Sequence, residues 1–446
     1  MSEMKATVIE TKNGFHVEGY EKIEYDFTFL DGVFNTENTQ LAKCYERWGR
    51  CLAVMDLNIF NIYGSQMQKY FDHHGLELRI HKTMIGEKAK SMETLLGIVD
   101  SMTDFGIIRK EPVLVVGGGL VTDVAGFACA AYRRNTNFIR IPTTVIGLID
   151  ASVSIKVAVN YGNYKNRLGA YHAPMHTFLD FQFLRTLPEG QVRNGFAELI
   201  KISSCAHLPT FDSLDKFCEK LISTSFGRSN DTTSDARQAA DEINRAGIFE
   251  MLKLETPNLH EIGLDRLSPK VPLRHGDAIS IDMAYSATLA NQRGLLSNEE
   301  HHRILNLFSR AGLSMDHELF DENMLDKATK AILKTRDCKL RAAVPNPLGS
   351  CVFLNDVSAE EMNAALRRHK EVMKQYPRNG EGIDAFVDAS DTGYTVNDVP
   401  VEQAALNGKM ANGETNGHTN GHMGCNGILN PLQQGLANGY SNGYKN

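Results

Sequence analysis

Three consecutive glycines, Gly117 to Gly119, lie between an apolar segment and a helical pattern, where a phosphate group could bind. Glycine lets the backbone approach a phosphate closely, and the following helix directs its first N–H groups and its dipole at the anion. The spacing is not GxGxxG, so the usual dinucleotide-binding fingerprint is absent. We expect Asp123 on the first turn of that helix, where capping of the helix is the alternative to a role at the site.

Polar side chains interrupt the small and apolar stretch from Pro142 to Pro174. They are Asp150, Lys156, Asn160, Lys165, Asn166, Arg167 and His172. Charged residues among Val, Ile and Ala either pair with one another or face a polar cleft. The lysines, Asn166 and Arg167 together offer donors suited to phosphate and hydroxyl groups, whereas each charge taken alone could equally belong to a structural ion pair.

A third group of side chains could bind a metal ion. Glu198 and Lys201 are one helical turn apart, so they share a face of the predicted helix. Their immediate neighbours are apolar, which favours a partly buried carboxylate able to ligate a metal over an exposed ion pair. His275 is expected at the start of a later helix, where a structural histidine is the alternative.

The elements that must position these residues divide the chain in two. Residues 15–185 alternate short apolar runs, predicted as strands at 51–56, 113–119 and 138–144, with helical patterns such as Ser91 to Phe105. This alternation predicts a parallel sheet with helices on its faces. Residues 186–389 are mostly helical in pattern. The sequence therefore predicts an α/β N-terminal domain and an α-helical C-terminal domain, with a ligand cleft between them.

The two ends of the chain differ in composition from this body. We treat residues 1–14 as an N-terminal extension and 390–446 as a disordered tail, since the last forty residues hold seven Asn-Gly dipeptides and few apolar side chains.

The whole chain has 446 residues and a net charge of −7, which disfavours nucleic-acid binding. No apolar run approaches the roughly 18 residues of a membrane span, and the start of the chain lacks the apolar region of a signal peptide. We therefore expect a cytoplasmic protein that binds neither nucleic acid nor membrane.

Taken together, these segments resemble the sugar phosphate cyclase family, which includes dehydroquinate synthase and the sedoheptulose 7-phosphate cyclases. The resemblance covers about residues 15–388. Its strongest blocks are EPVLVVGGGLVTDVAGFACAAYRR, IPTTVIGLIDASVSIKVAVN, KNRLGAYHAP, FAELIK and TPNLHE. It implies a dehydroquinate synthase-like fold, with a Rossmann-like NAD-binding domain, a helical metal and substrate domain, and a homodimer.

The resemblance also implies roles for residues at matching positions. NAD would be bound by Asp56, Glu87, Lys90, Gly117, Gly118, Gly119, Asp123, Thr143 and Thr144. The catalytic groups would be Asp150, Lys156, Asn160, Lys165 and Lys201. Substrate contacts would come from Asn166, Lys339 and Arg134, the last from the partner subunit. Glu198 and His275 would ligate zinc, or another divalent metal such as cobalt.

The chemistry that the resemblance implies is the cyclisation of a sugar phosphate, sedoheptulose 7-phosphate. Transient oxidation by NAD, β-elimination of phosphate, return of the hydride and an aldol closure form the ring, and loss of water gives a gadusol-type product. Ala173 and Thr335 favour this branch, because valiolone synthases typically have Pro and His at these positions. A valiolone or dehydroquinate synthase is the alternative within the family.

The sequence departs from the family pattern in one place. The family's middle zinc-ligand histidine lies in a GHTWSP-like segment before His275. Here TPNLHEIGLDRL runs directly into SPKVPLRHG, so that about a dozen residues of the family pattern, including this histidine, are absent. Three interpretations stay open: a faulty gene model of an active enzyme, recruitment of another ligand such as His260, or an NAD-binding pseudoenzyme.

Overall fold

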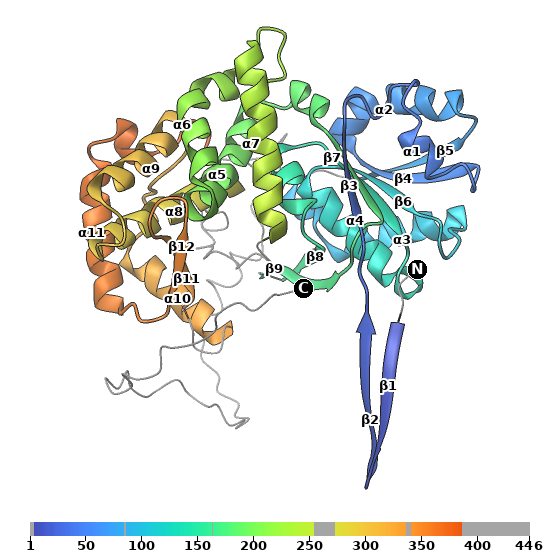
Figure 1. The fold of residues 1–446 in the computed structure, drawn as a ribbon, viewed down its shortest axis with the longest axis horizontal. Helices are drawn as coiled ribbons and strands as arrows, with labels where there is room; N and C mark the ends of the chain where they lie inside the picture. Colours follow the sequence, from blue (N-terminus) through green and yellow to red (C-terminus); the bar gives the residue numbers. More distant parts are fainter. Residues whose placement is uncertain (1–3, 84–85, 163, 254–272, 336–339, 386–446) are drawn as a thin grey trace, which may run out of the picture.

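The computed structural model describes residues 4–83, 86–162, 164–253, 273–335 and 340–385. Figure 1 shows an N-terminal half built on a sheet and a C-terminal half built of helices, with α7 (Ser234–Lys253) running between them. The predicted tail, His260 and Lys339 lie outside the described residues. No helix of the described part is both long and apolar enough to cross a membrane.

The N-terminal half contains a six-stranded parallel sheet. In spatial order its strands are β3 (Asp26–Leu30), β10 (His176–Asp180), β7 (Phe138–Pro142), β6 (Val113–Gly117), β4 (Arg50–Asp56) and β5 (Glu77–Thr83). The predictions of strands near 51–56, 113–119 and 138–144 are confirmed, with the last two ending two residues early. All residues of β6 and β7 are buried, as expected for central strands of a parallel sheet covered on both faces.

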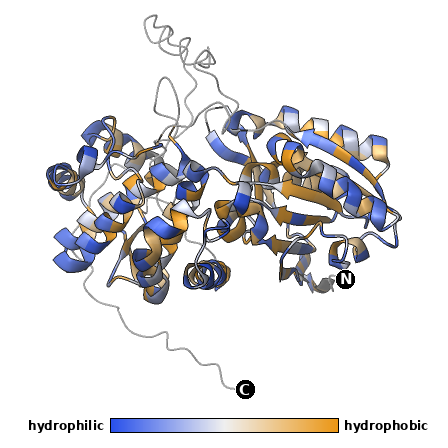
Figure 2. Ribbon diagram, turned by 90° about the horizontal axis from the view of Figure 1, so that it is seen from above, coloured by the Kyte–Doolittle hydropathy of each residue, from blue (hydrophilic) through white to orange (hydrophobic). Residues whose placement is uncertain are grey.

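Helices cover both faces of this sheet. They are α1 (Gln40–Lys43) and α2 (Leu57–His73) on one face, and α3 (Met92–Phe105) and α4 (Gly119–Ala131) on the other. Strand β6 contributes Leu114 and Val116 to the first core and Val113 and Val115 to the second. Figure 2 shows the apolar residues of the sheet enclosed between the helical layers.

The strand order reverses between β4 and β6. From β4 the chain moves outward through α2 to β5, and it returns through α3 to β6 on the other side of β4. In open α/β sheets such a reversal opens a crevice at the carboxyl ends of the two strands. Asp56 ends β4 and Gly117 ends β6. A Cβ added at Gly117 would lie 3.3 Å from the Asp56 Cβ, so the two strand ends meet at this crevice.

Two antiparallel hairpins accompany the sheet. The first, β1 (Met4–Thr11) with β2 (Gly14–Glu21), projects from the body (Figure 1). It includes residues on both sides of the predicted boundary between residues 14 and 15. The second, β8 (Lys156–Tyr161) with β9 (Tyr164–Tyr171), packs on α4 so closely that a Cβ at Gly126 would lie 2.5 Å from Val157 Cγ1. This packing fixes the hairpin that carries four of the predicted site residues.

The C-terminal half is mainly helical, as predicted. Besides α7, its helices are α5 (Glu189–Ala206), α6 (Leu208–Ser223), α8 (His275–Gln292), α9 (Asn298–Arg310), α10 (Glu322–Thr335) and α11 (Ala359–Met373). A short antiparallel pair, β11 (Ala342–Pro345) with β12 (Cys351–Leu354), was not anticipated from the helical pattern. Helix α8 is buried along nearly its whole length and forms the centre of this half.

Helix α5 joins the two halves by close packing. A Cβ at Gly195 would lie 2.5 Å from Val145 Cγ1 and 3.1 Å from the Ile146 nitrogen, in the segment that follows β7. At the preceding residue of α5, a Cβ at Gly276 of α8 would lie 2.5 Å from the Asn194 carbonyl oxygen. Glycine at both positions lets α5 approach its two neighbours simultaneously.

The contact at Gly195 predicts a strong effect of a single methyl group. Gly195→Ala should lower the free energy of unfolding by about 1–3 kcal/mol, because the methyl collides with Val145 and a backbone nitrogen. Gly97→Ala in α3 is the matched control, since its nearest neighbour would be 3.9 Å away; we expect no loss there, or a gain of up to about 1 kcal/mol. Urea unfolding of both variants measures this, and equal effects would contradict the packing argument.

Candidate active site

The glycine turn at the end of β6 forms a cradle lined by backbone. Gly118 precedes α4 and provides no side-chain cap, so the first N–H groups of the helix are left for another acceptor. A Cβ at Gly118 would lie 3.2 Å from Thr144 Cγ2, and one at Gly119 would lie 3.1 Å from the Ala151 Cβ. Thr143 donates its N–H to the Gly117 oxygen at 3.1 Å, and its buried hydroxyl has no partner in the described part of the chain. The cradle fits a phosphate-bearing ligand at a helix N-terminus.

Asp123 lies deeper in α4 than predicted. It is the fifth residue of the helix and neither stands on the first turn nor caps it, so that expectation is wrong. The reason is that Gly118 is still extended, which delays the start of the helix. The Asp123 carboxylate instead accepts from Lys90 Nζ at 2.6 Å, and the lysine is 6% exposed. A nearly buried ion pair thus lies behind the glycine cradle.

Asn160 connects the predicted cofactor residues to the hairpin. Its side-chain amide donates to Glu87 Oε1 at 2.7 Å, and its backbone N–H donates to the Lys90 oxygen at 2.9 Å. Its side-chain oxygen accepts from the Asn166 N–H at 2.9 Å. The structure therefore brings together Glu87, Lys90, Asn160 and Asn166, which sequence spacing alone could not place.

Asp56, at the end of β4, caps the following helix α2. Its Oδ1 caps α2 by accepting from the N–H groups of Asn58 at 2.7 Å and Ile59 at 3.3 Å. Burial raises the pKa of Asp56, and the two backbone hydrogen bonds act in the opposite direction. Its carboxylate is thereby held at the crevice between β4 and β6.

The two predicted lysines of the hairpin lie at its opposite ends. Lys156 is the first residue of β8 and is exposed, whereas Lys165 is the second residue of β9 and is half-buried. With about 3.3 Å per residue along a strand, they stand more than 10 Å apart along the ladder. They therefore offer two separate points of attachment along the hairpin, which suits an extended ligand.

A second cluster forms where the two halves meet. Asp150 lies in η3 (Gly147–Ala151), a π-helical turn after β7, and Glu198 and Lys201 lie on α5. Burial, and after it the negative charge of Glu198, raise the pKa of Asp150 to about 6; the charges of Lys201 and His275 act in the opposite direction. Asp150 is thus a carboxyl group that exchanges its proton near neutral pH.

Glu198 has the surroundings of a metal ligand. The residue is 1% exposed, neither carboxylate oxygen accepts a hydrogen bond from the described residues, and Glu198 forms an ion pair with Lys201. The Lys201 side chain is 12% exposed and also acts on the Asp150 carboxyl, so two carboxyl groups share this ammonium group and a metal ion would balance the second negative charge. His275 begins α8, beside the contact between Gly276 and Asn194. Glu198 and His275 therefore fit a metal ion, although the described residues contain no cluster of three candidate ligands.

Arg140 is a residue that the sequence reasoning overlooked. It is fully buried in β7, and its Nη1 donates to the backbone oxygens of Ala151 at 3.0 Å and Ser154 at 2.8 Å. Burial lowers the pKa of its guanidinium to about 10. It clamps the chain on either side of Ser152 and so holds η3 and Asp150 in place. The sequence feature that could have indicated this role is the single arginine within the apolar strand FIRIP.

Arg134 lies away from both clusters within this chain. It follows the far end of α4 and is exposed, in a turn where Arg133, Arg134 and Asn135 all have positive φ. Thirteen helical residues separate it from Gly118, a length of about 20 Å. Lys339 lies outside the described residues, as does the segment 254–272, in which the family's middle histidine is expected.

Comparison with known proteins identifies the same architecture. Residues 80–194 match the family model 3-dehydroquinate synthase N-terminal, and residues 195–337 match 3-dehydroquinate synthase C-terminal. The chain is 51% identical over 399 residues to demethyl-4-deoxygadusol synthase of Trichormus variabilis, covering 86% of this chain and 97% of the relative. It is 35% identical over 369 residues to 2-epi-5-epi-valiolone synthase of Streptomyces hygroscopicus subsp. jinggangensis, covering 79% and 88%.

Solved structures agree with these matches. The 2-epi-5-epi-valiolone synthase of Streptomyces hygroscopicus subsp. jinggangensis, with NAD⁺ and Zn²⁺ bound, superposes with a TM-score of 0.73 at 33% identity, covering 80% of this chain and 99% of that one. A 2-deoxy-scyllo-inosose synthase complexed with carbaglucose-6-phosphate, NAD⁺ and Co²⁺ gives a TM-score of 0.63 at 20% identity, covering 82% and 99%. The second likeness shows the fold alone.

The pair of Lys90 and Asp123 predicts a variant with weakened cofactor binding. Lys90→Met leaves the Asp123 carboxylate uncompensated behind the glycine cradle, so we expect about tenfold weaker binding of NAD⁺. Lys110→Met is the control, because Lys110 is exposed near the opposite, amino end of β6. Isothermal titration with NAD⁺ measures both, and an unchanged affinity in Lys90→Met would contradict this assignment.

Glu198 predicts a variant that no longer responds to metal. Glu198→Gln keeps the shape of the side chain but removes the carboxylate, so Zn²⁺ should no longer raise the melting temperature. The metal-free variant should melt below wild type, because the Lys201 ammonium group loses its carboxylate partner. Glu189→Gln, on the same helix but with an exposed carboxylate that pairs with Arg193, should keep the response to Zn²⁺. Thermal melts with chelator and with Zn²⁺ measure this; a full Zn²⁺ response in Glu198→Gln would exclude Glu198 as a ligand.

Proposed function

The chain belongs to the 3-dehydroquinate synthase family, and from this premise we propose that it is a sugar phosphate cyclase that converts sedoheptulose 7-phosphate to demethyl-4-deoxygadusol. The observation that carries the proposal is the 51% identity to demethyl-4-deoxygadusol synthase, which extends over 97% of that relative. Identity to the valiolone synthases is 32–36%, and to the dehydroquinate synthases 28–30%. The enzyme would act in mycosporine biosynthesis, in the cytoplasm.

The crevice between β4 and β6 would hold NAD. The first N–H groups of α4 and the glycine cradle suit the pyrophosphate, and Asp56 stands at the neighbouring strand end, where an acidic group suits the ribose. When bound there, NAD⁺ supplies a hydride acceptor that can later return the hydride. The pair of Lys90 and Asp123 would set the charge behind the cofactor, and Thr143 and Thr144 would line its other side.

The cluster between the two halves would serve the substrate. Glu198 and His275 would hold a divalent metal, such as Zn²⁺ or Co²⁺, which supplies a Lewis acid that polarises a substrate oxygen. Asp150, with its pKa raised to about 6, can accept or release a proton at its carboxyl group near neutral pH. Lys201, on the same face of α5 as Glu198, supplies a fixed positive charge for an oxyanion.

The hairpin and the partner subunit would bind the phosphate end of the substrate. Lys156, Lys165 and Asn166 present donors along an extended hairpin rather than at one point. Arg134 is exposed in a strained turn far from its own cradle, which suits a contact with the site of a second subunit in a homodimer. Lys339 would add a further phosphate contact.

A second candidate function is NAD binding without turnover. The observation that favours it is that the described residues contain no group of three candidate metal ligands, whereas catalytic zinc usually has three protein ligands; Glu198 and His275 would provide two. The remaining ligand would have to come from the segment before His275, in which the sequence is shortened.

Phosphate release with product analysis tests the proposal. Full-length protein with NAD⁺ and Zn²⁺ should release phosphate from sedoheptulose 7-phosphate and form a dehydrated cyclohexenone, identified by mass spectrometry. Asp150→Asn should lower kcat by about 100-fold or more, because no other group in the cluster replaces its proton transfer.

The alternatives give distinct outcomes in the same assay. A product one water heavier indicates valiolone synthesis, and turnover only of the dehydroquinate synthase substrate indicates that activity. Tight NAD⁺ binding with no phosphate release would contradict cyclase activity and favour the non-catalytic function.

A further inference from the structure

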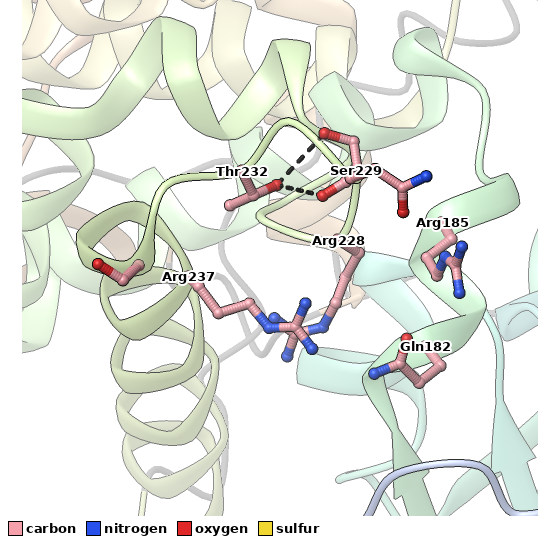
Figure 3. A pocket seen from close by; sticks show the side chains of 8 residues that line it. Gln182, Arg185, Arg228, Ser229, Thr232 and Arg237 are labelled. Carbon is pink, nitrogen blue, oxygen red and sulfur yellow. Dashed lines mark hydrogen bonds between the residues drawn. The ribbon is translucent and has the colours of Figure 1, made fainter.

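A polar pocket lies at the amino end of α7, outside the site described above. It has a volume of about 440 Å³ and is lined by Gln182, Arg185, Arg228, Ser229, Asn230, Thr232, Ser234 and Arg237. These residues come from η4 (Phe181–Thr186), from the loop between α6 and α7, and from the first turn of α7. Figure 3 shows the side chains of Arg228 and Arg237 directed to one place between these elements, with Arg185 and Gln182 across from them.

Arg228 is built into the wall of this pocket. The residue is 3% exposed, and its guanidinium stacks over the Phe181 ring at 5.3 Å. Nη2 donates to the Asp241 carboxylate, whereas the buried Nε–H has no partner in the described part of the chain. A buried guanidinium N–H without an acceptor is costly, and an anion in the pocket would supply the acceptor.

The pocket has an excess of positive charge. The three ionisable residues that line the pocket are all arginines. Asp241 forms an ion pair with one of them, Arg228. The side chains of Arg185 and Arg237 form no hydrogen bond or ion pair with the described residues. Hydroxyl groups of Ser229 and Thr232, which lie 3.2 Å apart, and the amino end of α7 add further donors and a favourable dipole.

The pocket is separate from the cyclase site. Helix α7 is twenty residues long, about 30 Å, and the pocket occupies its amino end. Farther along, α7 packs beside the cyclase cluster, because a Cβ at Gly247 would lie 2.8 Å from Leu199 and 3.9 Å from Ile149, the chain neighbours of Glu198 and Asp150. Arg237 is ten residues before Gly247, which corresponds to about 15 Å along the helix axis.

We propose that this pocket binds a phosphate group, carried either by inorganic phosphate or by a phosphomonoester. Arginine forks match phosphate oxygens in pairs, and three of them around one space favour a dianion over a carboxylate. A volume of about 440 Å³ holds more than a free phosphate, which leaves room for a small phosphorylated sugar. The proposal concerns binding and does not depend on the catalytic function above.

Binding titrations of the full chain, loaded with NAD⁺ and Zn²⁺, test this site. Inorganic phosphate and glucose 6-phosphate are the two probes, followed by isothermal titration calorimetry. In the double variant Arg185→Gln, Arg237→Gln, one binding event should weaken by tenfold or more, because two charged donors are lost. Arg245→Gln is the matched control, since Arg245 is an exposed arginine on the same helix outside the pocket.

The results distinguish a site for a phosphomonoester, a site for inorganic phosphate and a pocket that binds neither. Tighter binding of glucose 6-phosphate than of inorganic phosphate identifies a phosphomonoester site, and equal affinities identify a site for the phosphate ion. Equal affinities of wild type and double variant for both probes would overturn the proposal, as would an equal loss in Arg245→Gln. Arg185→Gln alone, at an exposed position, gives the same comparison if the double variant does not fold.

Discussion

The candidate active site depends on the close approach of α5 to two neighbours. Helix α5 meets the segment after β7 at Gly195 and the start of α8 at Gly276. A methyl group would collide with the Val145 side chain at the first position and with the Asn194 backbone at the second. One approach brings Glu198 to Asp150, and the other brings His275 to the same place. Because these three residues belong to three different elements, helix packing rather than local structure decides whether the site exists.

Charge balance is the second constraint on this site. Burial and the negative charges of Glu198 and Asp123 all raise the pKa of Asp150. Lys90 compensates Asp123 and Lys201 compensates part of Glu198, which leaves Asp150 with a pKa raised to about 6. A divalent cation between Glu198 and His275 would supply the missing positive charge. The lysines and the metal ion would therefore together balance the negative charge of the carboxylates.

Helix α7 links this region to a distant pocket. Its middle packs on η3 and α5 through Gly247, while its amino end carries Arg237 and adjoins the buried Arg228. A rigid helix of this length places two polar regions at a fixed separation, so an anion at one end would be held without entering the catalytic region. The shared helix connects the two sites physically, and the affinity of each site for its ligand is measured separately.

The sequence by itself determined the parts that depend on local pattern. Apolar runs predicted β4, β6 and β7, the glycine run marked the start of α4, and the i, i+3 spacing placed Glu198 and Lys201 on one face. Only the tertiary structure decided that Asp123 pairs with Lys90, that Arg140 holds the turn carrying Asp150, and that Arg185, Arg228 and Arg237 share a pocket. The physical reason is that strand and helix periodicity involves near neighbours, whereas these contacts join residues far apart in the chain. Their partners are set by the order of the strands and by how closely the helices pack.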